Sequence, residues 1–529
     1  MKRFFLMILC CMVLFATTSV AQVSDAMRKL NTALFAVSEL YVDTVDQDKL
    51  AESMIVHMLE ELDPHSSYTT AEETKEMNEP LEGNFSGIGI QFNIANDTLI
   101  VVQIIAGGPS ERVGMRAGDR IIAVNDSVVA GVGLKTSDVR KILRGPEGTK
   151  VEVTVLRKGS AKPIHFRITR EQIPIYSIDA SYMVDDKTGY IRVSRFAATT
   201  HDELVEAMQK LSKLGMTQLI LDLQDNSGGY LVSAVYMANE FLDKGNLLVY
   251  TEGDKSPRSE AVAEAQGSFS QNRLVVLIDE GSASSSEIVA GALQDWDRAV
   301  LVGRRTFGKG LVQRPIPFAD GSMIRLTVSR YYTPAGRCIQ KPYEKGDKES
   351  YYRDIYERYT HGEMMHADSI QFADSLQYKT LVTGRTIYGG GGIMPDVFVP
   401  LDTTLYTDYH RDIVAKGTLT QYALKYIDTH RKKLEKRYKK VDDFVRDFAV
   451  DAKMMDELRK MGDADSVEYD ADEAAKSYDM IARQLKALIA RDLFDMTAYF
   501  MVMNPVDPIY LKGLEIINNE EEYRKLLGR

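Results

Sequence analysis

A turn rich in small residues, between a predicted strand and a predicted helix, is the part of the sequence best suited to nucleophilic chemistry. The apolar run 274–278 predicts the strand, and an apolar pattern of helical spacing begins near residue 285. Ser284 lies in the turn, where the unpaired N–H groups and the positive dipole end of a helix can stabilise an oxyanion. Because Glu287 follows three residues later, the same serine also completes a capping box, which requires no catalysis. The local pattern favours neither interpretation.

A serine hydroxyl needs a neighbouring base to become a good nucleophile, and Lys309 is the candidate. It lies in the segment Thr-Phe-Gly-Lys-Gly at 306–310, where glycine on both sides permits tight backbone contact, and an apolar run at 299–302 leads toward it. A lysine accepts a proton at neutral pH only if its pKa is lowered, which burial away from water can do. The competing interpretation is an ordinary charged residue of a surface loop.

The elements that must position these two residues form a predicted α/β core. Beyond Pro174, runs such as 189–193 and 219–223 predict strands, and they alternate with helical stretches such as 202–214. From residue 403 onward, apolar residues recur at helical spacing, which predicts a helical extension. Similar helical stripes precede the core in the first part of the chain.

Short alternating runs punctuated by glycine indicate a small β-rich domain ahead of the core. Its stretch 107–119 reads Gly-Gly-Pro-Ser-Glu-Arg-Val-Gly-Met-Arg-Ala-Gly-Asp and closely resembles the signature of PDZ domains, over about residues 83–170. In PDZ domains an extended peptide adds as a strand, and backbone N–H groups capture its terminal carboxylate. The resemblance assigns this carboxylate-binding loop to Gly87, Ile88, Gly89 and Ile90. A simple glycine turn is the alternative.

Taken together, these residues resemble the carboxyl-terminal processing, or tail-specific, serine proteases. In that family a Ser-Ala-Ser-x-Ser-Glu turn supplies the nucleophile from its middle serine, and the base is the lysine of a Gly-Lys-Gly segment 25 residues later. Ser284 and Lys309 have this spacing. A glutamine four residues past the lysine holds it in place in the family, and Gln313 matches that position. The resemblance therefore implies a Ser-Lys catalytic dyad.

The family's Asp-Leu-Arg-x-Asn-x-Gly-Gly turn appears here at 222–229, with Gln224 in place of the arginine. This replacement puts in doubt any ion pair made by that side chain. The resemblance implies that the backbone of Gly228 or Gly229, together with the N–H of Ser285, forms the oxyanion hole. Asp295 fits an acidic position implicated in some members, and we interpret it first as a structural helix residue.

The predicted fold class is a multidomain α/β protein with N-terminal helices, a β-rich PDZ domain, an α/β Ser-Lys protease core and a C-terminal helical extension. We divide the chain accordingly into five parts: signal peptide 1–21, N-terminal helical segment 22–82, PDZ domain 83–174, protease core 175–400 and C-terminal helical extension 401–529.

Two alternative functions are weighed against the dyad. The stretch 225–229 resembles the serine loop of chymotrypsin-type proteases, which would make Ser227 the nucleophile with His57 or His65 as base. In that class, however, PDZ domains normally follow the protease domain, whereas here one precedes it. The second alternative is a non-catalytic PDZ scaffold. A phosphate-binding loop at 303–309 is rejected because Gly310 stands where a magnesium-binding Ser or Thr is required.

Composition limits the remaining classes. The net charge of −11 argues against a nucleic-acid binder, which needs a positive surface. His65 follows Asp63-Pro64 without any other metal-type side chain nearby, so we interpret it as a cap or surface residue. The sequence has no cluster of metal ligands with the usual spacing, and we expect no metal and no cofactor.

The first residues predict export. A basic start at 1–3, an apolar stretch at 4–16 and the small residues Ser19-Val20-Ala21 have the pattern of a secretory signal, with cleavage after Ala21. Cys338 is then the single remaining cysteine, so no intramolecular disulfide is expected, which fits a periplasmic location. The expected partners are protein or peptide substrates bound through their C-terminal tails. A homo-oligomer or an adaptor is a hypothesis for the helical extension.

Overall fold

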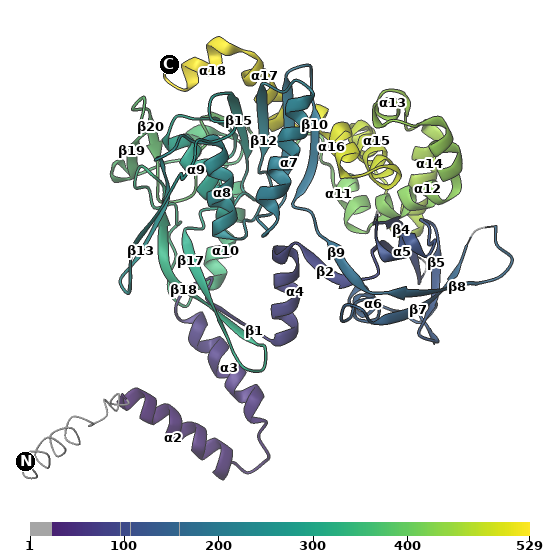
Figure 1. Cartoon of the computed structure of the whole chain (residues 1–529), viewed down its shortest axis with the longest axis horizontal. Helices are drawn as coiled ribbons and strands as arrows, with labels where there is room; N and C mark the ends of the chain where they lie inside the picture. Colours follow the sequence, from purple (N-terminus) through teal and green to yellow (C-terminus); the bar gives the residue numbers. More distant parts are fainter. Residues whose placement is uncertain (1–23, 96, 106, 158) are drawn as a thin grey trace, which may run out of the picture.

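The structure, a computed structural model, describes residues 24–95, 97–105, 107–157 and 159–529. The predicted signal peptide at 1–21 lies outside these residues. Helices at the N-terminus lead into a central α/β core, a β-rich domain lies to one side of the core, and a helical bundle lies next to both (Figure 1). Within the described part of the chain, no helix is both long and apolar enough to cross a bilayer.

The centre of the core is a six-stranded sheet in the order β10-β11-β12-β15-β16-β21. Strand β10 is antiparallel to its neighbour, and all the other pairs are parallel. The strands span Ile178–Met183 (β10), Thr188–Val193 (β11), Gln218–Asp222 (β12), Arg273–Ile278 (β15), Val300–Gly303 (β16) and Val397–Phe398 (β21). Every residue of β12 and β16 is buried. Parallel strands of this kind are largely apolar because helices cover both faces of the sheet.

Helices from distant parts of the chain form the two covering layers. One face packs against α7 (Thr200–Lys213), α8 (Leu231–Phe241) and α9 (Ser285–Asp295). The other face packs against α17 (Pro508–Asn518) and α18 (Glu520–Leu526). Gly513 lies directly on the sheet, since a Cβ there would be 2.7 Å from Leu277. These last two helices fall within the extension predicted at 401–529, and in the structure they supply one layer of the core.

A second sheet has the order β1-β18-β13-β14, with β17 paired to β18, and the loop that carries Lys309 leads into β17. Its strands span Ser67–Thr69 (β1), Leu247–Gly253 (β13), Ser256–Val262 (β14), Leu311–Pro317 (β17) and Met323–Tyr332 (β18). Strand β1 comes from the N-terminal helical segment, between α3 (Gln47–Glu60) and α4 (Ala71–Glu82), so that segment contributes directly to the core. The first described helix, α2 (Asp25–Leu40), has no buried residue and extends away from the body of the molecule (Figure 1).

The tyrosine-rich segment after β18 forms one helix and a small hairpin before the chain returns to the core sheet. They are α10 (Lys348–Thr360), β19 (Gln377–Lys379) and β20 (Thr386–Tyr388). Helix α10 brings Tyr351, which is 2% exposed, against His65 in the loop that precedes β1.

The β-rich domain is a sheet in the order β3-β4-β5-β7-β8, with β6 beside β5. Its elements span Ile90–Ala95 (β3), Thr98–Ile104 (β4), Arg120–Val124 (β5), Ser127–Val128 (β6), Lys150–Leu156 (β7), Ile164–Thr169 (β8), Pro109–Arg112 (α5) and Thr136–Leu143 (α6). A ribbon of β2 (Asn84–Gly87) and β9 (Glu171–Pro174) joins the points where the chain enters and leaves the domain. Strand β3 is at the edge of the sheet.

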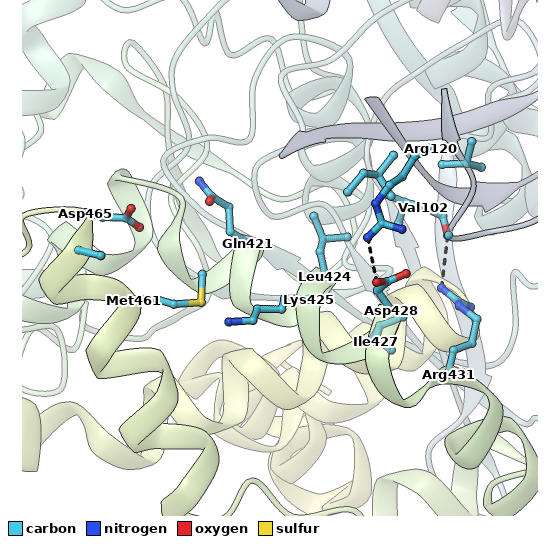
Figure 2. A pocket seen from close by; sticks show the side chains of 14 residues that line it. Val102, Arg120, Gln421, Leu424, Lys425, Ile427, Asp428, Arg431, Met461 and Asp465 are labelled. Carbon is cyan, nitrogen blue, oxygen red and sulfur yellow. Dashed lines mark hydrogen bonds and ion pairs between the residues drawn. The ribbon is translucent and has the colours of Figure 1, made fainter. Parts of the chain in front are cut away.

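The C-terminal bundle consists of α11 (Asp408–Ala415), α12 (Thr418–Arg437), α13 (Val441–Asp447), α14 (Ala452–Ala464), α15 (Ala471–Leu493) and α16 (Met496–Met503), which share an apolar core. Figure 2 shows its seam with the β-rich domain, where Arg120 pairs with Asp428 at 3.0 Å and Arg431 donates to the carbonyl of Val102 at 3.5 Å. A cavity of about 360 Å³ lies in this seam. The architecture as a whole confirms the predicted fold class.

Candidate active site

The nucleophile candidate lies at a strained turn between β15 and α9. Ser284 has φ 56° and ψ −112°, a conformation that L residues rarely adopt. An ordinary N-cap residue has an extended backbone, so this geometry is not that of a simple cap. Strained backbone of this kind is found where a tight strand-to-helix turn presents a reactive side chain. The capping box with Glu287 is also present, so the cap is formed, and the strained backbone is the feature that favours a nucleophile in addition.

Glu287 joins the serine turn to the lysine loop. Its side chain is fully buried, and its Oε2 accepts hydrogen bonds from the backbone N–H of Ser284 at 2.8 Å and of Lys309 at 2.9 Å. Its Oε1 accepts from the N–H of Gly308 at 2.7 Å and from the hydroxyl of Thr306 at 2.5 Å. Burial raises the pKa of Glu287 to about 7, although these hydrogen bonds oppose the rise. One carboxylate thus holds both candidate residues by their backbones.

The glycines beside Lys309 are required by close backbone packing. Gly308 has φ +90°, and a Cβ there would lie 3.1 Å from the nitrogen of Gly392. At Gly310 a Cβ would lie 2.7 Å from the nitrogen of Gln340. Burial lowers the pKa of the Lys309 amine, and the positive charge of Arg325 lowers it further. The neutral amine is the form of lysine that can serve as a general base, and a lowered pKa favours that form.

The turn at 222–229 packs directly against the serine turn. A Cβ at Gly228, which has φ +102°, would lie 2.8 Å from the Cβ of Ser284 and 3.0 Å from the nitrogen of Ser285. The N–H of Gly228 donates to the side chain of Asn226 at 2.9 Å. The carbonyl of Asn226 in turn accepts from the N–H of Ala283 at 2.9 Å. These contacts place the backbone of the predicted oxyanion hole beside the candidate nucleophile, Ser284.

The predicted carboxylate-binding loop lies at the start of the edge strand β3. The carbonyl of Ile88 accepts from the N–H and the hydroxyl of Ser110, and the carbonyl of Gly89 accepts from the N–H of Ile105 at 3.0 Å. Gly89 has φ +73°, and a Cβ there would lie 3.2 Å from Ile173. Gly87 ends β2 and Ile90 begins β3. An edge strand with an anion-binding loop at its beginning is suited to adding a peptide as a further strand.

Comparison with known proteins agrees with this geometry. The pattern of Peptidase family S41 matches residues 187–348, that of the PDZ domain matches 100–157, and that of a family of unknown function (DUF8443) matches 409–495. The core of this chain is that of an S41 peptidase. The chain carries a PDZ domain ahead of the S41 core. The matched family of unknown function lies within the C-terminal bundle.

Named relatives of this S41 chain include the probable CtpA-like serine protease of Staphylococcus aureus, which is 38% identical over 317 residues, covering 59% of this chain and 62% of that protein. The protein of the same name from Staphylococcus epidermidis is 36% identical over 315 residues, covering 59% and 63%. The alignment therefore spans about three fifths of these curated relatives. Among solved structures, a photosystem II D1 C-terminal processing protease is 29% identical, covering 60% of this chain and 91% of that chain, with a TM-score of 0.34.

In this S41 chain, Gln313 is fixed between β17 and β18. Its side-chain amide donates to the carbonyl of Leu311 at 3.1 Å and to the hydroxyl of Thr327 at 3.4 Å. These bonds hold Gln313 within its own strand pair. A direct role of Gln313 toward Lys309 stays a prediction.

The loop after α3 forms a wall of the lysine site that sequence reasoning missed. The Oδ1 of Asp63 accepts from the N–H groups of His65 and Ser66, each at 2.9 Å, and from the hydroxyl of Thr327 at 2.9 Å. Because Thr327 also receives the amide of Gln313, this loop is bonded to the hairpin that follows the lysine.

His65 is half-buried in that wall, which corrects its interpretation as a cap or surface residue. Its Nε2 lies 2.8 Å from the hydroxyl of Tyr351, and the two rings meet edge to face. Burial and the positive charge of Lys309 lower the pKa of His65 to about 3, so the ring is neutral near pH 7. No local pattern signals this position, because Tyr351 is 286 residues away in sequence.

The structure shows which contacts Gln224 makes in the 222–229 turn, where the family has an arginine. Gln224 donates its side-chain amide to Asp507, at the start of α17, at 2.9 Å. Arg192 pairs with Asp222 at 2.7 Å and donates to the carbonyl of Gln224 at 2.9 Å. The ring of Phe500 lies 4.6 Å from the Arg192 guanidinium. The ion pair of this turn is therefore made from β11, and Gln224 links the turn to the C-terminal helices.

Asp295 and Ser227 lie outside this arrangement. Asp295, at the opposite end of α9 from Ser284, is fully buried and pairs with Arg337 at 2.5 Å, as expected of a structural residue. Ser227 is exposed. His57 pairs with Glu60 and His65 with Tyr351, so the structure gives no support to a chymotrypsin-like triad. Among the residues that the structure describes, no group of three or more His, Cys, Asp or Glu could hold a metal ion.

Proposed function

We propose that this protein is a serine endopeptidase of the carboxyl-terminal processing type. Neutral Lys309 takes the proton of Ser284 as the serine oxygen attacks a peptide carbonyl. The lysine then gives that proton to the leaving amine, and water, deprotonated by the same lysine, hydrolyses the acyl-enzyme. The observation that carries the proposal is the shared carboxylate of Glu287, which binds the backbones of the nucleophile and the base at once.

The oxyanion of the tetrahedral intermediate would be stabilised by the N–H groups of Gly229 and Ser285. We favour Gly229 over Gly228 because the Gly228 N–H already donates to Asn226. Ser285 begins α9, so its N–H also carries the partial positive charge of a helix N-terminus. Donors fixed in this way stabilise developing negative charge without reorganisation.

The PDZ domain would bind the free C-terminal tail of the substrate. PDZ domains bind peptide C-termini by adding them as a strand, and the edge strand β3 with its loop Gly87–Ile90 offers that site. A scissile bond farther along the same polypeptide would then reach Ser284 in the core. We further propose that the substrates are exported proteins and that this protein is exported and periplasmic, on the basis of the signal pattern at 1–21.

Mass spectrometry of the products from a tailed test protein tests the activity. The wild type should release defined peptides, whereas Ser284→Ala and Lys309→Ala should release none yet still bind the tail. Ser227→Ala serves as the control and should cleave normally. A non-catalytic scaffold would show no difference between the wild type and Ser284→Ala. Amino-terminal sequencing of the mature protein from fractionated cells tests export, and a first residue other than one near Gln22 would contradict the predicted cleavage.

A further inference from the structure

Tyr331 occupies a buried position between the nucleophile and the base. It lies on β18, is 1% exposed, and packs in the same apolar core as the helices that cover the main sheet. Its backbone N–H donates to the carbonyl of Gly310 at 3.0 Å, which registers the residue against the lysine loop. The ring therefore has a fixed position from which its hydroxyl can act.

The hydroxyl of Tyr331 reaches the main chain of both candidate residues. It donates to the carbonyl of Ser284 at 3.1 Å, and it also hydrogen-bonds the carbonyl of Lys309. A phenol carries one proton, which two acceptors can share as a three-centre bond. Two carbonyl oxygens carry like partial charges, so a common donor between them offsets their repulsion.

This contact complements the one made by Glu287. The carboxylate binds the N–H groups of Ser284 and Lys309, and the phenol binds their carbonyl groups. Ser284 and Lys309 are therefore each held at the N–H and at the carbonyl, on both sides of the α-carbon. This matters because their two loops follow different strands, β15 and β16. Small errors matter here, because a displacement of about 1 Å between reacting groups can lower a rate by roughly 100-fold.

We propose that Tyr331 is a positioning residue that sets the separation of the Ser284 and Lys309 loops through its hydroxyl. This inference rests on the proposed function of that dyad. It acts through the backbone, since the phenol touches neither the reacting hydroxyl nor the amine. A phenylalanine ring at this position would leave the fold intact, but the alignment of the two loops would be lost with the hydroxyl.

Tyr331→Phe removes one oxygen atom and keeps the ring. Tyr332→Phe is the matched control, because it makes the same change one residue later, on a ring that stacks on Tyr250 at 4.8 Å instead. We expect Tyr331→Phe to lower kcat by about 100-fold with KM changed less than about twofold, and Tyr332→Phe to keep both values. Circular dichroism and thermal unfolding show whether either variant has lost folded protein.

Two further measurements separate alignment from a structural role. The labelling rate of Ser284 by a fluorophosphonate should fall in Tyr331→Phe, because this reaction needs the aligned base but no bound tail. The loss in the double variant Glu287→Gln/Tyr331→Phe should be smaller than the product of the single losses, since both side chains align the same two loops. Multiplicative losses would contradict a common role.

The outcomes distinguish this inference from the proposed function. If the wild type cleaves and Tyr331→Phe keeps its kcat and labelling rate, the role of Tyr331 is refuted while the peptidase stands. If activity falls only in proportion to lost folded protein, the hydroxyl is structural and the inference fails. If the wild type neither cleaves peptides nor reacts with the fluorophosphonate, the dyad itself falls, and the inference falls with it.

Discussion

Replacing Glu287 by glutamine should change how the stability of this protein depends on pH. The folded state raises the pKa of this carboxyl from 4.5 to about 7, because burial disfavours its charge. A group whose folded pKa is raised binds its proton more tightly in the folded state, so its contribution to stability is fully present below pH 4.5 and is lost as pH rises through 7. This rise in pKa corresponds to roughly 3 kcal/mol of unfolding free energy.

Glutamine cannot titrate, and it also cannot accept all four of the hydrogen bonds that the Glu287 carboxylate accepts. Its single carbonyl oxygen accepts two of them, and its NH₂ group faces two remaining donors. Each unsatisfied buried donor costs about 1–3 kcal/mol. We therefore expect Glu287→Gln to be less stable than the wild type near pH 4.5, and the difference to shrink by roughly 3 kcal/mol as pH rises past 7.

Urea unfolding followed at several pH values between 4.5 and 8 measures this difference. The exposed Glu76 on α4 offers a control, since Glu76→Gln makes the same chemical change at the surface and leaves Glu287 in place. The activity of the wild type should change with pH in the opposite direction to its stability. Because the ionised carboxylate of Glu287 holds the serine and lysine loops, kcat should rise as pH rises through about 7. A stability difference between wild type and Glu287→Gln that stays constant across this range would refute the reasoning.

Three further predictions follow from neighbouring contacts. His65→Ala should open the Lys309 amine to water and raise the pKa of that amine, which moves the acid limb of the pH profile of kcat/KM to higher pH. His65→Phe should keep the acid limb in place. The same profile for both variants would contradict the idea that the His65 ring shields Lys309 from water. Gly228→Ala should lower kcat by about 100-fold or more, because its Cβ would meet Ser284 at 2.8 Å, while Gly107→Ala, also at positive φ but with open space around it, should keep full activity. Asp428→Arg should replace a part-exposed ion pair, worth about 1 kcal/mol, by repulsion from Arg120 at the seam shown in Figure 2. Amide hydrogen exchange in β4 should then accelerate, while the amides of β12 stay protected. Unchanged exchange in β4 would show that this seam does not hold the PDZ domain.

The local motifs were readable from the sequence because their physical requirements are local. A turn that presents a serine needs small residues before a helix, and a loop packed against other backbone needs glycine beside its lysine. These requirements appear at Ser284 and Lys309 as residue types at fixed spacing. The glycine-rich signature of the PDZ domain is local in the same sense, and the alternation of strands and helices predicted the α/β core.

Other features depended on contacts between distant parts of the chain. The pattern of Ser284 and Glu287 suits a cap and a nucleophile equally. The structure contains the cap, and it adds two features that favour a nucleophile: the strained backbone of Ser284 and a carboxylate that also reaches Lys309. His65 looked like a surface residue until α10 brought Tyr351 to it. The helices α17 and α18 were predicted as part of an extension, yet they cover one face of the core sheet.

The sequence by itself thus determined which side chains are candidates for acyl transfer and for binding a peptide tail, since residue type and short-range spacing set both. The tertiary structure decided which groups hold those side chains in place, namely Glu287, Tyr331 and the Asp63–Ser66 loop. Their contacts join segments up to 286 residues apart in sequence. Such contacts arise when a whole core packs at once, and no local spacing encodes them.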